Sequence, residues 1–285
     1  MILKDNKKAR IRLTAGVVIL CLLVGMYTIP KTQAKSKFTY AYGVFLNAEP
    51  KDIPKMKNYY RVVIDAQYYS KKDVAKLKKA GHKVYSYINL GSIENFRPYY
   101  KEYEELTLSV YENWEDEKWV DVSKKKWQKF IGTTLANRLK KKGIDGYFVD
   151  NVDVYYQYHT KKIFDGVTTI LKKLKKKGYV IINGGDTYVR AYAKKNHTLK
   201  PVMSAVNQET VFSAIDFDND RKLGRNDKEN SAYFKEYVKL VKRFKKDVFL
   251  LEYTEDKSLI SEIKDFCKKN KFKWYITGDV DLKVP

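Results

Sequence analysis

Gly146-Tyr147-Phe148-Val149-Asp150, followed directly by Asn151 and by Asp153, is the stretch that decides the fold of this chain. It is a short apolar run that ends on a carboxylate, and Lys-rich helical patterns lie on both sides of it. A buried strand of this kind is typical of a (β/α) barrel, whose functional groups lie at the carboxyl ends of the strands. The stretch therefore predicts a fold and also the rim at which functional residues gather.

The same pattern occurs eight times. The predicted strands are 40–46, 61–66, 83–89, 146–150, 179–183, 202–207, 248–252 and 274–277. The predicted helices are 71–80, 124–142, 161–177, 188–194, 231–245 and 258–269. Strands that alternate with helices imply parallel βα units, and eight units favour a closed (β/α)8 TIM barrel of the α/β class. An open doubly wound sheet is the alternative that the pattern leaves open. The long loops 90–123 and 208–230 are expected to shape a cleft.

Residues 1–34 have the order of a secretory signal peptide. Basic residues up to Arg12 precede an apolar stretch over 13–27, and small residues surround Ala34. An uncleaved anchor is the alternative, although the apolar stretch is short for a span of about 20 residues. We therefore expect a single domain over 35–285, of the usual barrel size, in a protein that is secreted or held at the cell surface.

The chain is strongly basic, with a formal net charge of +23. Many of the lysines lie in helical runs such as residues 171–177 (LKKLKKK), which are typical of solvated outer faces. The sequence contains no helix, finger or sheet motif of the nucleic-acid-binding proteins, so we expect no nucleic-acid partner. An anionic cell-wall or membrane surface is a secondary expectation. We expect a monomer.

Polar side chains end most of the predicted strands. These candidates are Asp65, Asn89, Asp150, Asn183, Asn207, Glu209 and Glu252. A single acid at a strand end could simply cap the following helix. Several acids at one rim are different, because burial and like charge move their pKa values apart and allow acid–base chemistry.

Other kinds of site lack their residues. The three histidines, His82, His159 and His197, are scattered, and no nucleophile elbow or glycine-rich phosphate loop is present. We therefore expect no metal and no cofactor. Carboxylate chemistry in a groove rich in aromatic side chains remains, although many of the 24 tyrosines must serve the core.

Four sequence blocks carry a family resemblance. They are residues 63–69 (VIDAQYY), 87–94 (YINLGSIE), 97–99 (RPY) and 142–153 (KGIDGYFVDNVD). Together they resemble the endo-α-1,4-polygalactosaminidase family of glycoside hydrolases, over nearly the whole chain beyond the signal segment. The resemblance implies a (β/α)8 barrel that cleaves galactosamine-containing polysaccharide internally. It also implies that Asp150 is the nucleophile and Glu209 the general acid/base. Glu252 is the rival for the second role, since many barrel glycosidases use an acid after strand seven.

The remaining rim residues are expected to hold the sugar. Asp65, Asn89 and Glu94 are candidates for its amino and hydroxyl groups, with Asp153, Asn183, Asn207 and Glu252 beside them. A polymer of free galactosamine is cationic, which conflicts with the charge of the chain unless acids dominate locally. A non-catalytic carbohydrate- or cell-wall-binding barrel is the alternative function.

Overall fold

The computed structural model describes residues 37–112 and 114–285. The signal peptide predicted over residues 1–34 lies outside these ranges and stays a prediction, as does cleavage near Lys35. Residues from Lys37 onward belong to one unit of contacts. Within the described ranges, no helix combines the length and the apolar character needed to cross a membrane.

Eight parallel strands form the central sheet, in the order β1-β2-β3-β7-β8-β9-β12-β13. Their bounds are β1 Tyr40–Phe45, β2 Tyr59–Ile64, β3 Lys83–Asn89, β7 Gly146–Asp150, β8 Tyr179–Asn183, β9 Ala205–Glu209, β12 Asp247–Tyr253 and β13 Lys273–Thr277. The two outer strands meet through side chains, with the rings of Phe45 and Tyr275 edge to face at 5.4 Å. The predicted (β/α)8 TIM barrel is confirmed.

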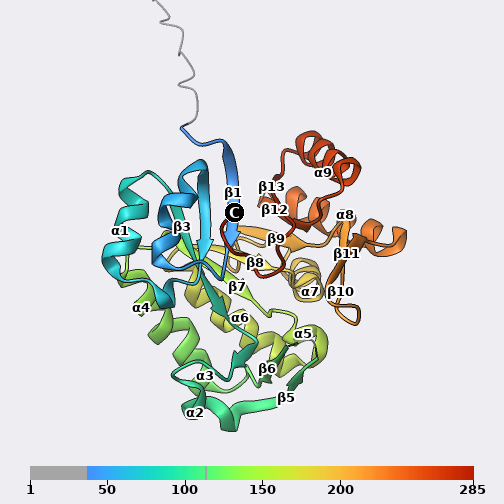
Figure 1. Ribbon diagram of the computed structural model, residues 1–285. Helices are drawn as coiled ribbons and strands as arrows, with labels where there is room; N and C mark the ends of the chain where they lie inside the picture. The colour runs from blue at the N-terminus through green and yellow to red at the C-terminus, as the bar shows by residue number, and fades with distance from the viewer. Residues whose placement is uncertain (1–36, 113) are drawn as a thin grey trace, which may run out of the picture. The chain divides into compact units, whose positions relative to one another are not determined.

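Helices surround the strands (Figure 1). The longer ones are α1 Lys71–Lys79, α6 Lys161–Lys175, α7 Asp186–Asn196, α8 Lys228–Arg243 and α9 Lys257–Asn270. The short ones are η1 Pro50–Asn58, η2 Ala66–Tyr68, α2 Tyr100–Tyr103, η3 Glu104–Leu106 and α5 Val154–Gln157. The helix predicted over 124–142 has three parts: α3 Lys125–Lys129, a π-helical segment η4 Phe130–Leu135, and α4 Ala136–Lys141. Side-chain periodicity does not reveal such a π-helical segment, because the widening is a local backbone event.

The strands of the barrel are closely packed. Tyr42 of β1 and Phe249 of β12 bring their ring centroids within 4.5 Å and are both fully buried. Gly146, the first residue of β7, has no room for a side chain, because a Cβ there would lie 2.0 Å from the carbonyl oxygen of Tyr179. The glycine that opens the fold-deciding stretch is therefore needed for β7 and β8 to approach each other.

Both long loops contain strands of their own. The first forms an antiparallel sheet of β4 Ser92–Glu94, β5 Thr107–Tyr111 and β6 Trp114–Val120, in the order β4-β6-β5. The second forms an antiparallel hairpin of β10 Ser213–Asp216 and β11 Lys222–Arg225. Both insertions follow carboxyl ends of barrel strands, as Figure 1 shows for β5, β6, β10 and β11. They also touch: the rings of Trp114 and Phe217 are 6.3 Å apart, and Arg221 lies 5.2 Å from the Trp114 ring.

Candidate active site

Asp150 and Glu209 accept hydrogen bonds from the same nitrogen atom. Asp150, Asn183 and Glu209 are the last residues of three neighbouring parallel strands, β7, β8 and β9. Nδ2 of Asn183 donates to Oδ1 of Asp150 at 2.9 Å and to Oε1 of Glu209 at 2.7 Å. Because both bonds meet at one atom, the two carboxylate oxygens lie within about 5.6 Å of each other. The topology thus places two acids close enough to act on one chemical group.

A chain of hydrogen bonds fixes this arrangement from inside the barrel. The amide of Asn207, which is fully buried, donates to Oδ1 of Asn183 at 2.7 Å. The phenol of Tyr42 donates to Oδ1 of Asn207 at 3.1 Å. On the other side, the phenol of Tyr253 donates to Oε2 of Glu209 at 2.6 Å. Asn183 is therefore oriented with its nitrogen toward the acids, which is the orientation that two carboxylates require.

Burial dominates the electrostatics of the two acids. It raises the pKa of Asp150, against the hydrogen bond of Asn183 that favours the charged form. It also raises the pKa of Glu209, and the nearby charge of Asp150 raises it further, while the hydrogen bonds of Tyr253 and Asn183 oppose the shift. Both carboxylates keep partial access to solvent. Raised pKa values bring the protonated form within reach, which a carboxyl group needs to give a proton to a bound molecule.

Asp153 faces the turn after β8. Each of its carboxylate oxygens accepts from the backbone N–H of Gly185 at 3.2 Å. Gly184 and Gly185 have φ of 61° and 66°, a left-handed conformation that few other residues adopt. Burial, and then the charges of Asp186 and Asp150, raise the pKa of Asp153 to about 7. Asp153 is half-buried and adds a third acid to the rim.

Asn89 belongs to a buried polar cluster that joins β3 to the first insertion. Its Nδ2 donates to Oε1 of Glu117 at 2.5 Å, and its Oδ1 accepts from the hydroxyl of Ser92 at 2.8 Å. Nδ2 of Asn151 donates to the same Glu117 oxygen at 2.8 Å. Burial raises the pKa of Glu117 to about 7. The Asn89 side chain is thus engaged by protein groups and ties the insertion to the end of β7.

Asp65 and Glu94 share a buried arginine. Arg97 donates to Oδ2 of Asp65 at 2.6 Å and to Oε1 of Glu94 at 2.8 Å. The phenol of Tyr87 also donates to Oε1 of Glu94, at 3.2 Å. Burial raises the pKa of Asp65 in spite of Arg97. Oε2 of Glu94 is buried and has no hydrogen-bond partner in the structure, so this oxygen is available to a further donor.

Glu252 lies on the other face of β12 from Tyr253 and does not join the two acids. Its carboxylate accepts from the backbone N–H groups of Val211, Phe212 and Ser213 at 2.9–3.3 Å. It also accepts from the Ser213 hydroxyl at 2.7 Å. The side chain is fully buried, and burial raises its pKa to about 7 despite these donors. Glu252 thus holds the loop that follows Glu209.

Three residues near the acids were not singled out by the sequence analysis. Glu117 and Tyr111 come from the insertion that was expected to be a loop, and Tyr253 is the neighbour of Glu252. Burial raises the pKa of Tyr111, and the charges of Asp150, Asp153, Glu117 and Glu209 raise it further, so its phenol lies near all four acids. The alternation of side chains along a strand could have indicated Tyr253, because it shares a face with buried Phe249.

No group of three or more His, Cys, Asp or Glu side chains in residues 37–112 and 114–285 is arranged to hold a metal ion.

Known proteins share both the sequence pattern and the fold. A profile of glycoside-hydrolase family GH114 matches residues 26–283. The glycoside hydrolase domain of PelA from Pseudomonas aeruginosa has a similar fold, with a TM-score of 0.70 at 13% identity over 85% of this chain and 95% of that one. Ega3 from Aspergillus fumigatus, in complex with galactosamine, has a TM-score of 0.67 at 18% identity over 88% of this chain and 96% of that one. An uncharacterized protein of Methanocaldococcus jannaschii is 23% identical over 283 residues, 87% of this chain and 77% of its own length.

Proposed function

Since the chain belongs to glycoside-hydrolase family GH114 and is a glycoside hydrolase, we propose that it cleaves α-1,4-linked galactosamine-containing polysaccharide at internal bonds. The resemblance inferred from the sequence blocks is confirmed by the family match. Membership favours the enzyme over the non-catalytic carbohydrate-binding barrel. The substrate is supported by the similar fold of Ega3, whose structure contains galactosamine, and by the acids gathered at the rim of this chain.

The observation that carries the mechanism is the nitrogen shared by Asp150 and Glu209. Their oxygens lie within about 5.6 Å of each other, compared with roughly 5–5.5 Å in retaining glycosidases and 6.5–9.5 Å in inverting ones. This bound lies near the retaining range and leaves little room for a water molecule in line with the sugar. We therefore infer a retaining mechanism through a covalent intermediate.

In the first step, Glu209 gives its proton to the glycosidic oxygen and Asp150 attacks the anomeric carbon. The C–O bond to the leaving sugar breaks, and an ester between Asp150 and the remaining sugar forms. In the second step, ionised Glu209 takes a proton from water, whose oxygen attacks the anomeric carbon and releases Asp150. The α-configuration is kept because the carbon is inverted twice.

The environments of the two acids support these roles. Asp150 receives a hydrogen bond from Asn183, which favours the charged form that a nucleophile needs. Glu209 lies beside the charge of Asp150, which favours retention of its proton. Once the ester forms, that charge disappears and the pKa of Glu209 falls, as the change from acid to base requires.

We propose direct substrate contact for Asp153 and for the free oxygen of Glu94. Asp153 is half-buried, and its oxygens accept a hydrogen bond from the backbone N–H of Gly185. Carboxylates can bind the ammonium group of galactosamine, and nearby charges outweigh the screened lysines of the outer faces. The contacts of Asp65, Asn89, Asn207 and Glu252 favour a positioning role for these four residues.

The experiment is incubation of the purified protein with de-N-acetylated α-1,4-galactosaminan, followed by separation of the products over time. We expect oligomers of intermediate length early, which marks internal cleavage. Asp150→Asn should lower the rate by at least about 10²–10⁴-fold. The control Asp165→Asn removes the same charge from a half-exposed position on α6 and should leave the rate unchanged. Cleavage of another polymer but not of galactosaminan would refute the proposed substrate.

We also propose that residues 1–34 are a signal peptide that directs export. The proposal rests on the basic, apolar and small-residue order of this segment. Amino-terminal sequencing of protein collected from the culture medium should start near Lys35. A sequence that begins at Met1 in membrane-bound material would instead identify an anchor.

A further inference from the structure

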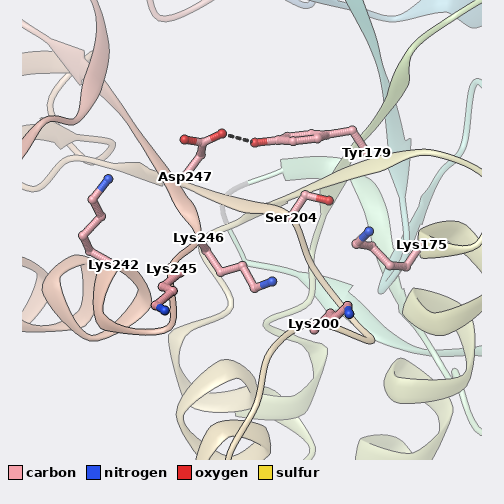
Figure 2. Close-up of a pocket in the computed structure, with 8 residues that line it drawn as sticks. All are labelled: Lys175, Tyr179, Lys200, Ser204, Lys242, Lys245, Lys246 and Asp247. Carbon is pink, nitrogen blue, oxygen red and sulfur yellow. Dashed lines mark hydrogen bonds between the residues drawn. The ribbon is translucent and has the colours of Figure 1, made fainter. Parts of the chain in front are cut away.

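A pocket of about 560 Å³ opens at the amino-terminal end of the barrel. Figure 2 shows the side chains that line it: Lys175, Tyr179, Lys200, Ser204, Lys242, Lys245, Lys246 and Asp247. Tyr179 and Asp247 are the first residues of β8 and β12, and Ser204 directly precedes β9. Glu209 ends β9, so pocket and acids lie at opposite ends of the same strand, roughly 16 Å apart along it.

The five lysines of the pocket have no acidic partners. Among the described residues, no carboxylate lies within ion-pair distance of any of them; the pocket's aspartate instead pairs with Lys273. The pocket's one acid, Asp247, is already engaged by the phenol of Tyr179 at 2.5 Å and by Lys273 at 3.2 Å. The pocket therefore has an uncompensated positive charge.

Helix dipoles account for only part of this cluster. Lys175 and Lys242 lie in the last turns of α6 and α8, where a positive charge is favourable. Lys200, Lys245 and Lys246 lie between elements, outside the last turns of these helices. Burial, and then the charges of Lys175 and Lys200, lower the pKa of Lys246. The fold thus holds like charges together at a cost that a bound anion would offset.

We propose that this pocket binds a phosphodiester chain, as in a polyol-phosphate polymer. Five positive charges exceed what a single phosphate can neutralise, which favours several phosphates on one chain. Lysine binds phosphate as a point charge and tolerates a flexible ligand. The site is concave, and none of its side chains is an exposed aliphatic or aromatic residue of the kind that enters a bilayer. Tyr179 is the pocket's one aromatic side chain and packs against Tyr85 at 5.4 Å, so the pocket lacks the row of aromatic rings on which single-stranded nucleic acids stack their bases.

The two ends of the barrel would then act independently. A polyanion held at the amino-terminal end leaves Asp150 and Glu209 open at the other end. The enzyme would be retained on an anionic surface while it cleaves a neutral or cationic polysaccharide. This inference does not depend on the identity of the sugar substrate.

The test compares two variants with equal changes in charge. The pocket variant carries Lys175→Gln, Lys200→Gln, Lys245→Gln and Lys246→Gln. The control variant carries Lys57→Gln, Lys72→Gln, Lys264→Gln and Lys269→Gln, which are exposed and outside the pocket. Binding of fluorescent poly(glycerol phosphate) is measured by anisotropy over a range of salt concentrations. We expect the pocket variant to bind at least about tenfold more weakly, with a shallower salt dependence, and the control to bind as the wild type does.

Hydrolysis of soluble substrate and the melting temperature are measured on the same proteins, and both should match the wild type. If the fourfold pocket variant does not fold, Lys246→Gln alone replaces it. An equal loss in the two variants would show diffuse attraction and overturn the site. Pocket-dependent binding of phosphatidylglycerol vesicles or of single-stranded DNA that equals or exceeds that of poly(glycerol phosphate) would also overturn the proposal, since the ligand would then be a membrane or a nucleic acid.

Discussion

The phenol of Tyr253 lies 2.6 Å from Oε2 of Glu209 and donates a hydrogen bond to it. The preceding residue of β12, Glu252, points to the opposite face and binds the loop that begins just after Glu209. One strand thus controls both the carboxylate of Glu209 and the backbone that follows it. Changing Tyr253 should therefore affect mainly the reaction, and changing Glu252 should affect mainly the stability of the fold.

Tyr253→Phe should slow the reaction without unfolding the protein. The variant loses a hydrogen bond to a charged group, so we expect kcat to fall about 10- to 100-fold. The lost bond favoured ionised Glu209, so the pKa of Glu209 should rise. Because Glu209 must be protonated to release the leaving sugar, the alkaline limb of the kcat/KM profile should move to higher pH. Tyr69→Phe is the control, since it removes a buried phenol that bonds to Ala48 away from the acids. An unchanged profile in Tyr253→Phe would remove Tyr253 from the mechanism.

Azide should rescue the two acid variants with opposite stereochemistry. In Asp150→Ala, azide takes the place of the missing nucleophile and attacks the anomeric carbon directly, so the glycosyl azide should be the β-anomer. In Glu209→Ala, with a substrate whose leaving group needs no protonation, Asp150 still forms the ester and azide should give the α-anomer. Proton NMR of the products distinguishes the anomers. An α-product from the Asp150 variant would show that the roles of Asp150 and Glu209 are the reverse of those proposed.

Glu252→Gln should lower stability more than it lowers chemistry. The glutamine amide would place N–H donors against the N–H groups of Phe212 and Ser213, so the free energy of unfolding should fall by about 1–3 kcal/mol. Ser213→Ala removes only one donor to the same carboxylate and should cost less. Denaturant unfolding and kcat are measured together. A loss of kcat as large as that of Glu209→Gln, at unchanged stability, would restore Glu252 as the second catalytic acid.

The free energy of unfolding should fall as pH rises from about 5 to 8. Burial raises the pKa of Glu117, Asp153 and Glu252 to about 7. The folded protein therefore holds protons that the unfolded chain, with carboxyl pKa values of about 4, has released. Stability from these groups is fully present below about pH 4 and is lost as pH rises through about 7. Burial lowers the pKa of His82, which makes the free energy of unfolding rise with pH. This is one group against three, so we expect the net effect to be a fall.

Glu117→Gln tests this prediction at one site. A glutamine oxygen can accept the hydrogen bonds that Asn89, Ser92 and Asn151 now donate to Oε1, while the titration is removed. The decline of melting temperature with pH should therefore be shallower than in the wild type. The exposed change Glu229→Gln should leave the slope as it is. A steeper slope in Glu117→Gln would contradict the sign of the effect.

The barrel could be predicted from the sequence because its strands are continuous apolar runs. The bounds predicted for β3, β7 and β8 agree with the structure to the residue. The strand predicted over 202–207 instead begins at Ala205 and extends to Glu209. Val202 and Met203 are fully buried but lie in the segment before the strand. Their apolar side chains therefore indicated burial correctly but did not indicate membership of a strand.

The environment of the acids could be predicted only in part. Position at strand ends predicted that Asp150, Asn183 and Glu209 would share a rim, and the structure places both acids within hydrogen-bond distance of Asn183. The hydrogen-bond partners of Glu252 could not be foreseen, because they are backbone groups whose direction depends on the path of a loop. Glu117 lies in a three-stranded insertion whose pairing joins segments without a repeating apolar pattern.

The contacts of Glu209 with β12 also affect when, during folding, the active site is complete. The chain is made from its amino terminus, and Tyr253 follows Glu209 by 44 residues. A chain synthesised only as far as α8 contains Asp150, Asn183 and Glu209, but it lacks Tyr253, which bonds to Glu209, and Glu252, which holds the loop after it. Catalytic competence should therefore be among the last properties that the protein acquires. Recovery of hydrolysis after dilution from denaturant would report completion of the barrel, later than the recovery of helical circular dichroism.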